Sequence, residues 1–197
     1  MTDPSLQEYY DELMNFYRSG ELRSLPNKDR RHNATILCFM LDTSREVNMY
    51  CGEMSIFRDQ FYSYIDKDNP DNPDGGAQLK NDMIEALGAF TQRPDVKLNI
   101  IVENYTDTLS RDFISPGVFA DGIRNGRIDI RRLDKTSVVA EGMTHCVYTD
   151  TRSVRIEENK EEHSGLFLAN MSDALLNKLD SNYKYLTHSS EPASLVV

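Results

Sequence analysis

The stretch from Thr144 to Leu186 constrains the possible fold of this chain more than any other. Residues 144–157 read as two β-strands, and the Thr-Asp-Thr-Arg segment at 149–152 between them has the chemistry of a turn. After an acidic loop, the apolar residues at 166–170 fit a third short strand, and leucines at helical spacing predict a helix from 173 to 186. This segment therefore predicts a β-hairpin, one further strand and a closing helix.

The preceding part of the chain alternates predicted helices with predicted strands. The expected helices are 3–19, 33–41, 56–65, 78–92 and 115–125, and the expected strands are 45–50, 96–102 and 128–131. The apolar run at 33–41 fits a helix or a strand, and the strand pattern that follows it closely favours a helix. Strands that alternate with crossover helices are typical of α/β folds with a parallel sheet, to which the late hairpin adds antiparallel strands. We expect a mixed, mainly parallel central sheet flanked by helices.

The 197 residues fit one domain, or one domain with a small appendage. Residues 22–31 are polar and include Pro26, so 1–32 are predicted to be an N-terminal helix and a linker. The α/β domain is expected at 33–190, and 191–197 are expected to be a flexible tail. The Pro-rich and Gly-rich run at 66–76 is predicted to be a loop.

Charge and cysteine content limit the partners and the compartment. The net charge is −10 and the isoelectric point about 4.9. Nucleic acid and anionic membranes attract clustered cations, so neither is an expected partner. No apolar run approaches the roughly 20 residues that span a bilayer. The three cysteines lack CxxC spacing, which favours a reduced, cytoplasmic setting.

His145 enters the predicted hairpin, and Asn170 ends the later strand. This arrangement resembles the active-site half of the phospholipase-D-like superfamily, and segment 46–55 (EVNMYCGEMS) resembles the early strand and glycine turn of that family. The resemblance covers roughly residues 33–190 and implies one phospholipase-D-like half. In the family the His attacks a phosphodiester phosphorus while a Lys and an Asn bind the phosphate oxygens. The resemblance therefore implies a nucleophile at His145 and a ligand-binding role for Asn170.

The chain departs from the family motif, which is His, any residue, Lys, four residues, Asp. Val147 and Arg152 stand at the Lys and Asp positions. Charge that develops on a phosphate must be neutralised by fixed cations, which Val147 cannot supply. Arg152 or Arg155 is a candidate substitute, and we include Arg155 among the predicted ligand-binding residues. Family enzymes use two halves, from a duplicated chain or a homodimer, and this chain has room for one. The resemblance thus implies a degenerate single half.

Two further candidates follow predicted strands. Glu53 and Glu103 each lie where a strand ends, the edge of an α/β sheet at which ligand sites form. Cys38 and Cys51 have apolar surroundings typical of a core. The acidic run at 157–162 fits a solvated loop, and no HExxH, CxxC, EF-hand or phosphate-loop pattern occurs. The sequence predicts no metal and no cofactor.

Three hypotheses for the function follow. The first is a pseudoenzyme that binds protein partners, as a homodimer or with another protein; the resemblance associates such stand-alone modules with bacterial or phage antiviral defence. The second is a homodimeric phosphodiesterase or nuclease that uses His145. The third is a nucleotide or small-ligand sensor that uses the same crevice. The missing Lys, the single half and the acidic charge favour the first hypothesis, and so a protein that is not an enzyme.

Overall fold

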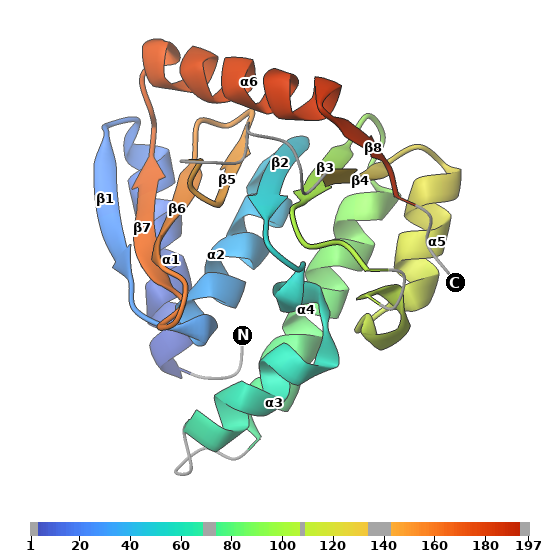
Figure 1. The fold of residues 1–197 in the computed structure, drawn as a ribbon. Helices are drawn as coiled ribbons and strands as arrows, with labels where there is room; N and C mark the ends of the chain where they lie inside the picture. Colours follow the sequence, from blue (N-terminus) through green and yellow to red (C-terminus); the bar gives the residue numbers. More distant parts are fainter. Residues whose placement is uncertain (1–3, 69–73, 107–108, 134–142, 194–197) are drawn as a thin grey trace.

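The computed structural model describes residues 4–68, 74–106, 109–133 and 143–193 (Figure 1). Its α-helices are α1 (Pro4–Ser19), α2 (Arg30–Thr43), α3 (Asp59–Asp68), α4 (Gly75–Gln92), α5 (Pro116–Arg124) and α6 (Asp173–His188), with 3-10 turns η1 (Ser55–Phe57) and η2 (Leu109–Asp112). Its strands are β1 (Arg23–Asn27), β2 (Glu46–Cys51), β3 (Lys97–Val102), β4 (Ile128–Leu133), β5 (Cys146–Thr149), β6 (Val154–Asn159), β7 (Ser164–Ala169) and β8 (Ser190–Pro192). The helices and strands expected from the sequence are confirmed.

All of these strands form one sheet in the order β1-β7-β6-β5-β2-β3-β4-β8. Strands β2, β3 and β4 run parallel, while every other neighbouring pair among the described strands is antiparallel. The mixed α/β architecture with flanking helices is confirmed, but the expectation of a mainly parallel sheet is wrong. Short turns join β5, β6 and β7, and such turns can connect only antiparallel strands. Two strands that the sequence did not predict add further antiparallel pairs at the edges.

Helices cover both faces of the sheet. Helices α1, α2 and α4 bury their apolar sides in the main core, whereas α6 crosses the opposite face (Figure 1). In β3, Leu98 and Ile100 join the main core, while Ile101 packs with Tyr50 and Leu186 on the α6 side. The alternation predicted for 96–102 and its central position are therefore confirmed. The residues of α4 that face this core are Leu79, Met83, Leu87 and Phe90, as expected.

Both edge strands correct the sequence interpretation. Residues 23–27, expected within a linker, form β1, and residues 190–192, at the start of the expected tail, form β8. Strand β1 pairs with β7, and its Pro26 is tolerated because β1 is an edge strand with one side free of ladder bonds. The expected loop at 66–76 is shortened by α3 and α4, and residues 69–73 and 194–197 lie outside the described residues.

Candidate functional site

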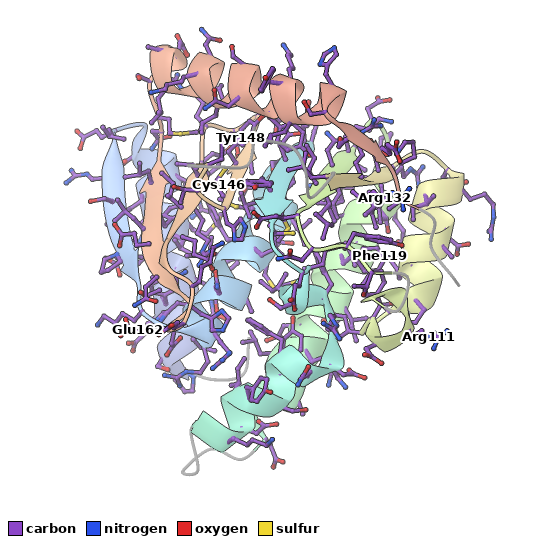
Figure 2. All side chains as sticks on the ribbon, viewed as in Figure 1. Arg111, Phe119, Arg132, Cys146, Tyr148 and Glu162 are labelled. Atoms are coloured by element: carbon purple, nitrogen blue, oxygen red, sulfur yellow. The ribbon has the colours of Figure 1, made fainter. Side chains whose placement is uncertain are left out.

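The β5–β6 hairpin sets which side chains share a face with His145. Val147 pairs with Arg155, and the backbone N–H of Glu157 donates to the His145 carbonyl oxygen at 3.0 Å. Because alternate residues of a strand point the same way, Val147, Arg155 and Glu157 share the α2 side of the sheet, and the backbone bond places His145 opposite Glu157. Cys146 and Tyr148 point to the other face, beneath α6 (Figure 2). The hairpin therefore places an imidazole, a guanidinium and a carboxylate side by side.

Two carboxylates bracket the His145 ring. Nδ1 lies 2.9 Å from Oε2 of Glu157, and Nε2 lies 2.9 Å from Oε2 of Glu103. A neutral imidazole carries one N–H and can donate to only one of them, whereas the imidazolium donates to both. The imidazole is largely buried, with 10% of its side chain exposed.

A glycine makes room for this ring. A Cβ on Gly52 would lie 3.2 Å from Cε1 of His145, closer than most such contacts. Gly52 directly follows β2, which ends at Cys51. The ring also meets Tyr50 edge-on, with 5.2 Å between the ring centroids. Packing thus fixes the position of the imidazole between its two carboxylates.

Of the two carboxylates, Glu157 is the more buried and faces both His145 and Arg155. Burial alone would raise the pKa of Glu157, but the hydrogen bond from His145 and the charge of Arg155 outweigh burial and lower it. Nη2 of Arg155 lies 3.8 Å from Oε1 of Glu157, so the pair attracts without a direct hydrogen bond. Glu103 is more exposed, and Nζ of Lys160 lies 3.9 Å from its Oε2. Carboxylates therefore dominate the immediate surroundings of His145.

Of the residues proposed from the sequence, Glu103 and Arg155 lie close to His145, and Glu53 lies at the edge of the same region. The Glu53 carboxylate is 3.9 Å from Nη1 of Arg58 and lines a cavity that Arg155 also lines. Asn170 lies elsewhere, because its amide nitrogen donates to the carbonyl oxygens of Phe16 and Glu21. These bonds join β7 to the end of α1, and the ligand-binding role of Asn170 stays a prediction.

Glu157 was missed as a site residue, since the acidic run that follows it fits a solvated loop. The expected turn at 149–152 would place residue 156 opposite residue 145. The observed register, with Cys146 opposite Ile156, instead places residue 157 opposite residue 145, so the signal lay in the exact length of the turn. Only the first acidic residue of the run belongs to the site, while Glu158 is exposed on the other side of β6.

Other reactive groups do not add to this site. Burial raises the pKa of the Cys51 thiol to about 12 and that of the Cys146 thiol to about 11, so both are protonated near neutral pH. Within the described ranges, no group of three His, Cys, Asp or Glu side chains is arranged to hold a metal ion. The same part of the chain contains no helix with the length and apolar character needed to cross a membrane.

Comparison with solved structures gives neighbours of low sequence identity. TrmBL2, an archaeal chromatin protein with a novel mode of DNA binding, superposes with a TM-score of 0.51 at 13% identity over 96% of this chain, which spans 63% of TrmBL2. The phospholipase D family member Nuc from Salmonella typhimurium has a TM-score of 0.49 at 12% identity, over 88% of this chain and 97% of Nuc.

Phosphatidylserine synthase from Haemophilus influenzae Rd KW20 also has a TM-score of 0.49, at 9% identity over 87% of this chain and 39% of the synthase. No family model matches the sequence, and no curated protein matches it. At such identities the likeness to TrmBL2 concerns the fold alone. The fold is thus an α/β architecture with a mixed, mostly antiparallel sheet between helices.

Proposed function

We propose that this protein is a phospholipase-D-like half that does not hydrolyse phosphodiesters and that acts by binding another protein or a second copy of itself. The family resemblance rests on His145 at the hairpin entry and on the glycine turn at Gly52. The observation that carries the loss of hydrolysis is the contact between Nε2 of His145 and the Glu103 carboxylate.

A histidine nucleophile needs a nitrogen lone pair directed at the phosphorus. Nδ1 and Nε2 of His145 both face carboxylate oxygens at 2.9 Å, so a nitrogen that donates to its carboxylate has no free lone pair. Two carboxylates also repel the anionic oxygens of a phosphodiester. Val147 provides no cation on this face, and the Lys160 ammonium is mostly exposed. These features oppose both attack on phosphorus and stabilisation of the transition state.

Protein binding is supported by the incomplete burial of the helix α6, which covers one face of the sheet. Within α6, only Leu186 is fully buried. Leu175, Leu176, Leu179 and Tyr183 contact the sheet while remaining partly exposed, and Tyr185 is 60% exposed. Partly exposed apolar groups next to an exposed aromatic are typical of protein contact surfaces. The role in antiviral defence remains an expectation from the resemblance.

We expect the purified protein to show no metal-independent hydrolysis of a generic phosphodiester, of nucleic acid or of phospholipid. The assay compares wild type with His145→Ala over a range of pH, and both should match the blank. Thermal melting confirms that the variant is folded. Metal-independent phosphodiesterase activity that His145→Ala abolishes would replace this proposal with a homodimeric phosphodiesterase.

We expect the protein to form a homodimer or a tight complex that buries at least about 1,200 Å² in total, the size of a stable interface. Light scattering at tens of micromolar, with a pull-down for other partners, measures this. Tyr185→Ser should weaken the association at least tenfold, because it removes an exposed aromatic contact. Ile123→Ser, at an exposed site on α5, and His145→Ala should leave it unchanged. A monomer with no retained partner contradicts the proposal.

A further inference from the structure

Arg155 is a buried cation that the proposed function does not use. Its side chain is only 9% exposed, and it points from β6 into the apolar layer between the sheet and α2. Nε and Nη2 have no hydrogen-bond partner among the described residues. Burial lowers the pKa of Arg155, and its charge is opposed at a distance of 3.8 Å by Glu157, whose other oxygen serves His145. A buried guanidinium with two unsatisfied donors is costly unless something binds them.

The two unsatisfied donors are a matched pair. Nε–H and Nη2–H form one edge of the planar guanidinium and point in parallel, the fork that binds two oxygens of a carboxylate or phosphate. Two waters or the two oxygens of one oxyanion could accept these hydrogen bonds, but only the oxyanion also brings a charge opposite to that of the guanidinium. The chemistry of the edge therefore favours a ligand with two neighbouring oxygens.

A cavity of about 80 Å³ lies beside Arg155, and Arg155 and Glu157 line it together with α2 and the turn after β2. This volume holds several waters or one small oxyanion. Most of the other lining groups are apolar, including Ile36, Met40 and Phe61. An ion pair formed there is weakly screened and so stronger than at the surface.

An outer hollow of about 240 Å³ adjoins the cavity, since Glu53, Ser55, Phe61 and His163 line both. The outer hollow adds Arg30 and Arg58, and the Arg30 guanidinium lies 5.1 Å from the centre of the Tyr64 ring. Arginines are thus present at the mouth as well as the base, in a protein whose net charge is −10. These guanidinium groups are partly offset by the carboxylates of Glu53 and Glu157, which line the same region.

We propose that the cavity beside Arg155 binds a small oxyanion, a free anion or the carboxylate or phosphate group of a larger ligand, held by the Nε and Nη2 edge of Arg155. The His145 ring does not line the cavity among the described residues, although Glu157 borders both the ring and the cavity. The oxyanion supplies the hydrogen bonds that the buried guanidinium lacks, while the outer hollow leaves room for the remainder of the ligand.

The test measures binding of inorganic phosphate and, separately, of acetate by calorimetry and by thermal shift, at constant ionic strength set with sodium chloride. Wild type should bind at least one of the two with a dissociation constant in the millimolar range or tighter. Arg155→Met should weaken that binding at least tenfold, and Arg155→Lys should also weaken it, because Lys keeps the charge but lacks the fork. Arg124→Met, at an exposed site on α5, should bind as wild type does.

A response to phosphate alone assigns a phosphate group, a response to acetate alone assigns a carboxylate, and either supports the proposal. Equal stabilisation by chloride, or unchanged binding in both Arg155 variants, would mean an adventitious ion only and overturns it, as does the absence of binding. Should Arg155→Met fail to fold, the Arg155→Lys comparison decides the result. Hydrolysis of phosphodiesters would overturn the proposed function and leave this inference intact, so the two failures are distinguishable.

Discussion

Replacement of Glu157 by Ala is expected to destabilise the protein by roughly 3–5 kcal/mol, the cost of breaking a buried charge cluster by removing one partner. The side chain of Glu157 is only 13% exposed, and it holds Nδ1 of His145 while facing Arg155. Without it, the Arg155 guanidinium keeps its burial and loses its nearest counter-charge. Chemical denaturation of the two proteins at neutral pH gives the difference in the free energy of unfolding.

The neighbour Glu158 provides the matched control, since it is exposed on the same strand. Glu158→Ala should change the free energy of unfolding by no more than about 0.5 kcal/mol. A similar small effect for Glu157→Ala would show that the cluster contributes little to stability.

The free energies of unfolding of wild type and Glu157→Ala should also respond differently to a fall in pH. Because the pKa of Glu157 is lower in the folded state, its contribution is fully present above the ordinary carboxyl pKa of about 4.3. It is lost as the pH falls through the lowered value, when the folded state must take up the proton. The stability gap between wild type and Glu157→Ala should therefore narrow below about pH 4. A gap that stays constant to lower pH contradicts this assignment.

Replacement of Leu87 by Ala should cost roughly 2–5 kcal/mol, through lost transfer free energy and the cavity left behind. Leu87 has no exposed surface and belongs to the main core, which also contains Leu98 and Ile100 of the central strand β3. Denaturant unfolding measures the loss, and Glu85→Ala on the exposed side of α4 should leave stability nearly unchanged. A cost below about 1 kcal/mol would show that α4 is not packed on the sheet as described.

The elements predicted from the sequence were those with strong apolar periodicity. The helix α4, the strand β3 and the β5–β6 hairpin carry such patterns, and the structure has them at nearly the expected positions. The strands β1 and β8 have none, because an edge strand of a few residues needs only one partner and few apolar side chains. Pro26 indicated a linker because proline lacks the backbone N–H that donates a hydrogen bond to a neighbouring strand. That missing donor disrupts a central strand, but an edge strand such as β1 tolerates it.

The site was only partly predictable. His145, Glu103 and Arg155 were selected from strand ends and strand alternation, and the structure brings them together. Asn170 was selected by family resemblance, and its amide bonds instead to the end of α1. Glu157 required the register of the hairpin, and the cavity beside Arg155 required the packing of α2 against the sheet. Distances between side chains of different strands depend on tertiary packing, which the pattern of residue types along the sequence does not specify.

The pairing of β1 with β7 has a consequence for synthesis on the ribosome. Leu25 pairs with Phe167, so β1 emerges roughly 140 residues before its partner. At 5–20 residues per second, the delay is on the order of 7–30 s. During this time β1 has no hydrogen-bonding neighbour, and the nascent chain exposes the apolar residues that later meet β7. The growing protein thus has a long interval in which chaperones can bind the β1 segment, and the sheet is completed only after residues 190–192 of β8 have emerged.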